Sequence, residues 1–176
     1  MSNKNHSKKV MGTDKWQERP DISWWVVGFV DGEGTFSVSL FRNRTANLGW
    51  QVFPEFVVTQ GEKSLPSLRV VKDFFGCGKI YVNRRYDNHK ENIYRYCVRS
   101  RKDLQGKIVP FFESYPLKTE KSSDFAKFSK VLNLLDQGRH LSKEGLKEIA
   151  VIIETMNRRK KSAYLESPEA IRQDPK

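Results

Sequence analysis

The pattern of apolar and polar positions predicts a helix followed by two strands at the start of the ordered chain. An apolar run over residues 22–31 follows Asp21, a favourable helix N-cap residue, and ends at Gly32, as in a short buried helix. Residues 35–41 then alternate strictly between apolar and polar side chains, and residues 50–60 resume the extended pattern after a polar turn. Two strands of a hairpin are expected there.

The same order repeats further along. Helical spacing over residues 63–75 is closed by Gly76, and alternation over residues 79–83 and 94–99 predicts a second hairpin. Aromatic side chains with helical spacing, Trp24, Phe74, Phe111 and Phe125, are expected in the core. The rest of the pattern is helical, over residues 102–114, 118–137 and 142–159, with Ser142 as a helix start. The fold class is therefore expected to be α+β.

The length of 176 residues suits one domain with two tails. Residues 1–20 are polar and basic without apolar periodicity, so we expect a flexible N-terminal arm. Residues 21–160 form the expected single domain, and residues 161–176 a polar C-terminal tail that frays. Within the second strand, Pro54 predicts an irregularity or an exposed edge.

The charge of the chain favours a polyanionic partner. Lysine and arginine outnumber aspartate and glutamate by 32 to 21, which gives a net charge of +11 and a pI near 9.7. Because these residues are spread along the chain, nucleic acid fits better than a membrane surface, and a basic ribosomal protein is the alternative. The apolar stretch at residues 24–30 is too short for the roughly 20 residues of a membrane span. No membrane partner and an intracellular location are expected.

Candidate chemistry concentrates at the end of the first helix, in the sequence Val-Val-Gly-Phe-Val-Asp-Gly-Glu-Gly over residues 26–34. Gly28 and Gly32 lie four residues apart on one helical face, so two such helices can cross closely. Asp31 belongs to the last helical turn and Glu33 lies just past it. Glu33 can therefore project toward a metal, assisted by exposed carbonyls such as that of Gly32.

Residues 28–34, Gly-Phe-Val-Asp-Gly-Glu-Gly, resemble the signature of the LAGLIDADG homing endonucleases. Two further segments resemble elements of that family: Val58-Thr59-Gln60, and residues 115–121, Tyr-Pro-Leu-Lys-Thr-Glu-Lys. The element order also resembles its core. The resemblance implies an αββαββα core with a saddle-shaped antiparallel β-sheet, followed by additional C-terminal helices.

The same resemblance implies roles for individual residues. Glu33 is the expected metal ligand, with the backbone carbonyl of Gly32, and it stands where Asp is commoner in the family. Asp31 is expected to be structural and to hydrogen-bond to the partner helix end. Gln60 is expected to help order the attacking water. Lys121, or less favourably Lys118, is expected to stabilise charge on the phosphate. The implied cofactor is Mg²⁺, with Mn²⁺ or Ca²⁺ able to replace it for binding.

Only one acid-bearing apolar helix of this kind is found in the sequence. One motif per chain implies a homodimer, whose interface is expected to contain Val27, Gly28, Asp31 and Gly32. Two symmetric subunits predict a palindromic or near-palindromic DNA target.

Alternation also identifies the residues expected to face double-stranded DNA, because two hairpins per subunit can form a sheet lying along the major groove. Within this set Arg95, Arg99, Arg85 and Gln51 are the best candidates for base edges, with phosphate contact or simple exposure as the alternative. The full set comprises Thr35, Ser37, Ser39, Phe41, Arg42, Arg44, Gln51, Phe53, Glu55, Val57, Lys79, Tyr81, Asn83, Arg85, Arg95, Cys97 and Arg99.

The expected function is that of an intron-encoded, divalent-metal-dependent, site-specific DNA endonuclease. It would make a double-strand break with short 3′ overhangs in a long near-palindromic target, in an organelle or in a bacterial cytoplasm. Two alternatives remain open at this point: a maturase that binds its host intron RNA and does not need Glu33, and a DNA-binding regulator that no longer cleaves.

Overall fold

Two helix-strand-strand units build one antiparallel sheet in this protein. The structure is a computed structural model that describes residues 19–84, 91–157 and 162–167. The strands lie in the order β1-β2-β4-β3, with both hairpins antiparallel. Their bounds are β1 (Gly34–Arg42), β2 (Trp50–Gly61), β3 (Lys79–Asn83) and β4 (Ile93–Val98). The expected α+β fold class is confirmed.

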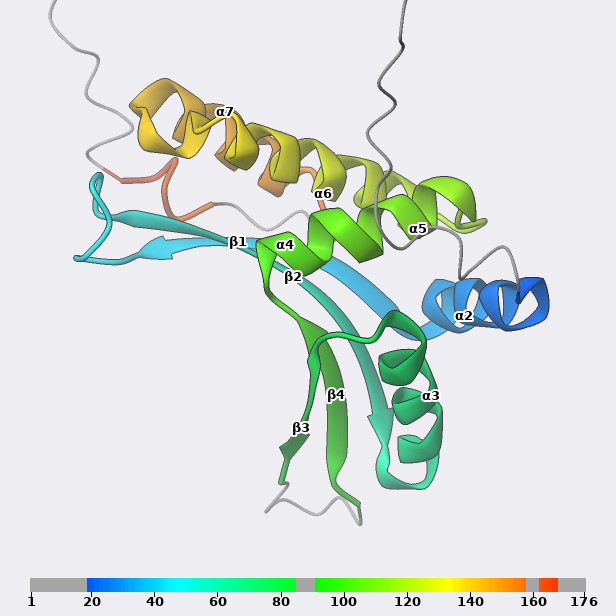
Figure 1. The fold of residues 1–176 in the computed structure, drawn as a ribbon. Helices are drawn as coiled ribbons and strands as arrows, with labels where there is room; N and C mark the ends of the chain where they lie inside the picture. The colour runs from blue at the N-terminus through cyan, green and yellow to red at the C-terminus, as the bar shows by residue number, and fades with distance from the viewer. Residues whose placement is uncertain (1–18, 85–90, 158–161, 168–176) are drawn as a thin grey trace, which may run out of the picture.

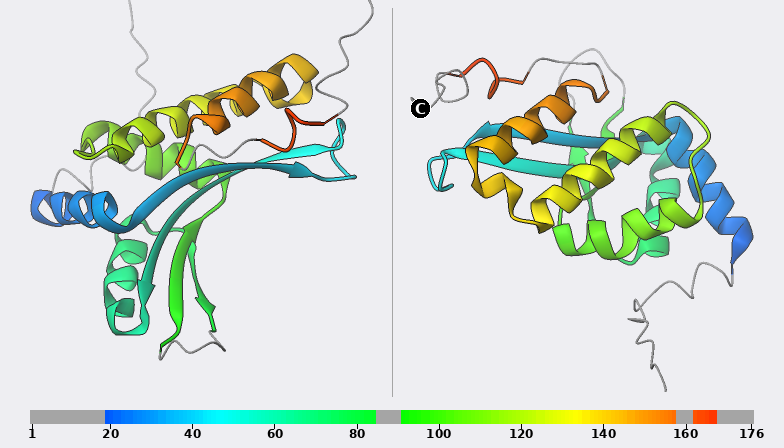
Figure 2. Two further views of the ribbon diagram at one scale, coloured as in Figure 1. Left: turned by 180° about the vertical axis from the view of Figure 1, so that it is seen from behind. Right: turned by 90° about the horizontal axis from the view of Figure 1, so that it is seen from above.

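The helices cover one face of the sheet. In Figures 1 and 2, α6 and α7 lie over β1 and β2, α3 lies beside β2 and β4, and α2 projects from the end where β1 begins. The segment predicted as one helix over residues 102–114 is continuous but contains a π-helical turn, Leu104–Ile108. The bounds are α2 (Pro20–Glu33), α3 (Leu65–Phe75), α4 (Arg101–Asp103), α5 (Val109–Ser114), α6 (Lys121–Asp136) and α7 (Lys143–Glu154), with 3₁₀ turns at Glu62–Ser64 and Arg139–Leu141.

Helix α2 begins earlier and ends later than the apolar run predicts. It starts at Pro20, because proline at the first helical position has a suitable φ and needs no amide partner. Asp21 is therefore in the first turn and is not the N-cap. At the other end Glu33 is the last helical residue. In contrast, Ser142 caps α7 as predicted, its Oγ accepting a hydrogen bond from Gly145 N at 3.1 Å.

The sheet divides into two arms because β4 pairs with only part of β2. All of β2 from Trp50 to Val58 faces β1, whereas β4 pairs only with Phe56–Gly61. The first half of β2 therefore has a free edge on its second side, where a proline removes no sheet hydrogen bond. Pro54 lies in that half, as the predicted edge position requires, although its side chain is buried. The two arms that result diverge in Figure 1 and leave a concave face opposite the helices.

The core lies between the sheet and its helices and is rich in phenylalanine. Phe36 of β1 is fully buried and packs against Phe56 of β2, with ring centroids 5.0 Å apart. Its edge-to-face contacts with Phe112 and Phe125 bring α5 and α6 onto the strand. Phe36, Val38, Phe56 and Val58 are all buried, so alternation correctly assigned the inward face of this hairpin.

A second, smaller cluster closes the far end of the β1–β2 hairpin. Trp50 packs edge to face on Tyr164 with ring centroids 5.2 Å apart, next to Leu146 and Ala150 of α7. Tyr164 is only 2% exposed, so the expectation that residues 161–176 fray is wrong for the described residues 162–167. None of the helices in the described ranges combines the length and apolar character needed to cross a bilayer.

Candidate active site and nucleic-acid interface

Glu33 stands at the corner where α2 turns directly into β1. Its side chain is exposed, as is Gly32 beside it, whereas Asp31 is half-buried. Gly34 makes the corner possible: a Cβ at this position would lie 2.5 Å from Val30 Cγ1 and 2.8 Å from the Val30 carbonyl oxygen. The glycine therefore lets the strand leave the helix without a spacer residue, which places Glu33 at the edge of the sheet.

Asp31 ties this corner to the loop that precedes α6. Its Oδ2 accepts a hydrogen bond from Lys118 N at 2.8 Å, and its Oδ1 accepts from Thr119 N at 3.3 Å and Thr119 Oγ1 at 2.8 Å. The structural role expected for Asp31 agrees with this geometry. Here the carboxylate holds a loop of its own chain, and the expected hydrogen bond to a partner helix end stays a prediction.

The loop brings Lys121 to the acidic corner. Its Nζ donates a hydrogen bond to the Gly32 carbonyl at 3.1 Å. Burial lowers the pKa of Lys121 below its ordinary value, while the negative charges of Asp31 and Glu33 act in the opposite direction. Lys118 points elsewhere, with Nζ 5.7 Å from the ring centroid of Trp24. Of the two predicted lysines, the structure brings only Lys121 to the helix end.

Gln60 reaches the same region through the register of the sheet. Gly34 pairs with Val58, so Gln60, two residues further along β2, lies beside the end of α2. It pairs with Tyr94 of β4. Alternation puts its side chain on the same side of the sheet as Val58. Within the described residues, no hydrogen bond joins Gln60 to Glu33 or Lys121.

The exposed face of α2 combines two glycines with two tryptophans. A Cβ at Gly28 or Gly32 would meet no atom of this chain within 4 Å. Trp24 is 48% and Trp25 40% exposed, so the expectation that Trp24 fills the core is wrong. Val27, expected at the dimer interface, is buried in its own chain. Positions 24, 28 and 32 lie one helical turn apart, so this spacing identifies the exposed face in the sequence. The core assignment of Trp24 overlooked this signal.

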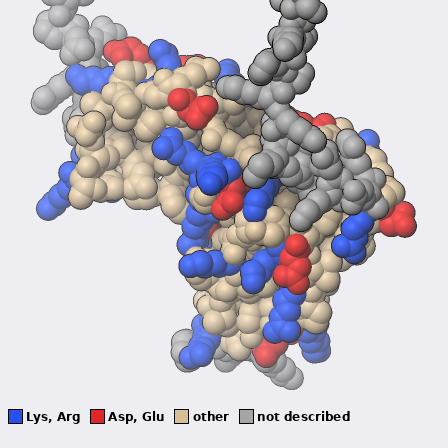
Figure 3. Space-filling model, viewed as in Figure 1, with Lys and Arg blue, Asp and Glu red and all other residues tan. Residues whose placement is uncertain are grey.

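The concave face of the sheet carries most of the residues expected to face DNA. Figure 3 shows lysine and arginine side chains in the angle between the two arms and along the β3–β4 hairpin. Gln51 is partly engaged already, because its Oε1 accepts a hydrogen bond from Asn43 Nδ2 at 2.6 Å. Arg85 lies outside the described residues. Exposed members are Thr35, Ser39, Phe41, Arg42, Arg44, Lys79, Tyr81, Asn83 and Arg99, and half-buried members are Ser37, Gln51, Phe53 and Arg95.

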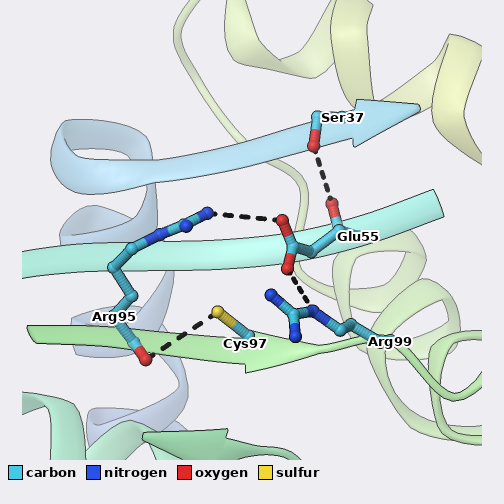
Figure 4. A network of polar contacts seen from close by, with 5 residues as sticks. All are labelled: Ser37, Glu55, Arg95, Cys97 and Arg99. Atoms are coloured by element: carbon cyan, nitrogen blue, oxygen red, sulfur yellow. Dashed lines mark hydrogen bonds and ion pairs between the residues drawn. The ribbon is translucent and has the colours of Figure 1, made fainter. Parts of the chain in front are cut away.

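Three members of the predicted DNA-facing set are buried: Glu55, Val57 and Cys97. Alternation assigned them to the concave face, but Arg95 and Arg99 lie over the Glu55 carboxylate and both form ion pairs with it (Figure 4). Burial, followed by the charge of Glu55, raises the pKa of the Cys97 thiol to about 11, so this thiol stays protonated at neutral pH. The expectation that these three side chains contact bases directly is therefore wrong, because they lie beneath the surface.

Register also reveals a concave-face residue that was not assigned to DNA. Thr59 pairs with Arg95, so by alternation its side chain lies on the same face as Arg95 and Val57. Its outward orientation was readable from the sequence.

Comparison with known proteins agrees with this architecture. The profile of the LAGLIDADG endonuclease family matches residues 26–132. A "Probable intron-encoded endonuclease 3" of Neurospora crassa is 34% identical over 76% of this chain, although the chain spans only 24% of that relative. The homing endonuclease I-TnaI is 43% identical with a TM-score of 0.70, covering 78% of this chain and 89% of that one.

A longer solved structure shows the same fold with nucleic acid. I-SmaMI, bound to an uncleaved DNA target in the presence of calcium ions, is 35% identical with a TM-score of 0.73. The match covers 82% of this chain but 47% of the I-SmaMI chain. With the motif at the end of α2, the shared fold and a family profile that spans most of the described domain, this chain belongs to the LAGLIDADG endonuclease family.

Proposed function

We propose that this chain is the subunit of a homodimeric, site-specific DNA endonuclease that makes a double-strand break in a near-palindromic target. The observation that supports this proposal best is the junction at Glu33. Residues 31–34 combine three features there: an exposed helix face with glycines, an exposed carboxylate beside Lys121, and the first residue of the concave sheet. Chemistry, assembly and DNA recognition thus share one corner.

The donors at this corner suit Mg²⁺. Glu33 and the Gly32 carbonyl offer hard oxygen atoms, and Mg²⁺ in nucleic-acid enzymes uses one or two carboxylates together with water and substrate phosphate. The described residues contain no cluster of three or more metal-binding side chains, so one chain supplies part of a ligand set. A second copy of Glu33 at the dimer axis would complete it. When bound, the metal supplies Lewis-acid stabilisation of negative charge on the scissile phosphate.

The remaining steps belong to side chains of the protein. The Lys121 ammonium stabilises the charge that develops on the phosphate, and Asp31 holds the loop that carries it. Gln60 orients the attacking water from the neighbouring strand. Hydrolysis breaks the phosphorus–oxygen bond to the 3′ oxygen, which leaves with a proton from solvent. One such centre per strand yields a double-strand break with short 3′ overhangs.

The dimer proposal follows from the exposed face of α2. Apolar side chains such as Trp24 and Trp25 are costly to leave in water, and Gly28 and Gly32 allow a second helix to approach closely. Relatives of two sizes fit this reading, because the chain matches most of I-TnaI but about half of I-SmaMI. Two symmetric copies would require a near-palindromic target.

The decisive experiment is cleavage of a randomised DNA library by the purified protein in Mg²⁺ or in EDTA, with sequencing of the new ends. We expect metal-dependent breaks clustered in one near-palindromic sequence. Glu33→Gln should lower cleavage about a hundredfold or more, as for loss of one transition-state-stabilising group, while DNA affinity stays within a few-fold.

Glu120→Gln is the matched control, because it removes the same charge from an exposed residue next to Lys121 and should leave cleavage unchanged. Full cleavage by the Glu33→Gln protein would contradict the site assignment. Tight RNA binding without DNA breaks would instead support a maturase.

A further inference from the structure

Glu55 occupies an unusual position for a carboxylate on a DNA-facing sheet. Phe56 forms the last pair between β2 and β4, with Val98. Glu55 of β2 and Arg99, the first residue after β4, lie just beyond this pair, where the sheet divides. Glu55 faces the concave side yet is only 8% exposed. Its Oε2 accepts a hydrogen bond from Arg95 Nη2 at 3.3 Å, and its Oε1 accepts from Arg99 Nε (Figure 4).

The contacts of Arg99 fix the orientation of its guanidinium plane as well as the position of its charge. Its Cζ lies 4.9 Å from the ring centroid of Tyr81 and 5.7 Å from that of Phe53, so two aromatic side chains flank the guanidinium. The bond to Glu55 uses Nε. Among the described residues neither Nη atom of Arg99 has a hydrogen-bond partner. These terminal nitrogens form the pair of donors that matches O6 and N7 of guanine.

Both guanidinium groups remain accessible while they are held. The side chains of Arg95 and Arg99 are each 41% exposed, against 11% for the side chain of Glu55 beneath them. A long arginine side chain otherwise samples many rotamers, and ordering it on binding costs free energy. A buried acceptor shared by two arginines removes part of that cost before DNA arrives.

We propose that Glu55 is a specificity-determining positioning residue, which holds Arg95 and Arg99 on the concave face in the orientation that reads guanine. This inference rests on the proposed DNA-cleaving function. The carboxylate acts in two ways. It orients the guanidinium donors, and its negative charge weakens the attraction of the two arginines to any DNA phosphate. The first effect strengthens binding to the correct sequence, and the second weakens binding to all other sequences.

The register locates the affected bases relative to the cleavage centre. Gly34, next to Glu33, pairs with Val58, and Ser37 pairs with Glu55, so three residues of β1 separate the two points. At roughly 3.3 Å per residue this is about 10 Å. Along DNA that distance corresponds to about three base-pair steps. The guanine preferences should fall inside each half-site rather than at its outer end.

The test is selection of bound sequences from a randomised DNA library in Ca²⁺ with the full chain, Glu55→Gln and Glu62→Gln. Glu62 directly follows β2 and is exposed, and the amide oxygen of glutamine can still accept its 3.5 Å hydrogen bond from Asn92 Nδ2. For Glu55→Gln we expect a loss of about fivefold or more in guanine preference at one or two positions per half-site. Affinity for random DNA should be unchanged or higher. Glu62→Gln should keep every preference.

Glu55→Asp provides a second variant if the glutamine variant does not fold, because it keeps the charge and withdraws the oxygens by one methylene. It should lose the same positions. Unchanged preferences in folded variants would overturn the inference alone, as would an equal loss at every position, which indicates a general structural role. A wild-type protein that enriches no DNA sequence would overturn the proposed function and this inference together.

Discussion

At the scale of single residues, two lysines of one loop have different environments. The backbone N of Lys118 donates to Asp31, while its ammonium lies over the ring of Trp24. Lys121 stands three residues further on, at the first position of α6, and its ammonium contacts Gly32. The sequence favours Lys121 only slightly, because both lysines occur in the segment that resembles the family element. The hydrogen bonds of Asp31 decide which one turns toward Glu33.

This difference predicts unequal effects of neutralising the two lysines. Lys121→Met should lower the rate of DNA cleavage about a hundredfold, because it removes a positive charge from the proposed site of phosphate hydrolysis. Lys118→Met should change the rate only a few-fold. Single-turnover cleavage with saturating protein measures both, and equal DNA affinity in a binding assay controls for lost phosphate contacts. Equal rate losses for the two variants would contradict the assignment of Lys121.

Glu55 shows where residue-level prediction ends. Period-two alternation correctly placed Glu55, Val57 and Cys97 on the concave face. It could not show that Glu55 is buried, because the two arginines that cover it lie about forty residues later in the chain. Alternation assigns a face to each side chain. Burial on that face depends on long-range neighbours that no local pattern contains.

At the scale of elements, helix α2 was predictable in kind but not in its ends. Its apolar run marked the buried side, where Val26, Val27 and Val30 lie. Proline at the first position and the sharp exit at Gly34 extended it in both directions. The core assignment of Trp24 was wrong because helical spacing alone cannot separate a buried apolar face from an exposed one. Both faces of such a helix carry large apolar side chains.

The turn between α6 and α7 contains a titrating residue. His140 lies in the 3₁₀ turn Arg139–Leu141, and its Nδ1 has no hydrogen-bond partner among the described residues. Burial, and then the positive charge of Arg101, lowers the pKa of His140 below its ordinary value of 6.5. Below pH 6.5 the unfolded chain therefore binds a proton that the folded chain resists. The stability contribution is complete above pH 6.5 and is lost as the pH falls.

His140→Gln should flatten the decrease in unfolding free energy below pH 6.5, since glutamine does not titrate. Urea unfolding at a series of pH values measures this slope. Arg101→Gln should reduce the same slope in part, because it removes the second cause of the lowered pKa. If His140→Gln left the pH dependence unchanged, other groups would have to account for it.

At the scale of the whole molecule, the order of elements and the antiparallel hairpins were predictable because both depend on local periodicity. The division of the sheet into two arms was not. It depends on how far β4 pairs along β2, and that register is fixed by contacts between distant segments such as Phe56 and Val98. The burial of Tyr164 is similar, because one aromatic ring in a polar tail gives no periodic signal.

The proposed assembly of two copies gives the last prediction, in which one substitution should leave the stability of the subunit intact but weaken its association. Gly28→Leu places a side chain where this chain has open space, so the isolated subunit should fold as well or better, by up to about 1 kcal/mol in helix propensity. The same side chain would separate two α2 helices that must cross closely. Sedimentation with target DNA should show loss of the two-subunit complex, and double-strand cleavage should fall with it.

Gly106→Leu is the matched control, because Gly106 is also helical and a Cβ there likewise meets nothing within 4 Å. It lies in the π-helical turn between α4 and α5, outside α2, and should leave association intact. An undiminished two-subunit complex with Gly28→Leu would mean that another surface joins the copies. The Glu33 carboxylates would then have no shared axis, and the proposed pairing of the two metal sites would fail with the interface.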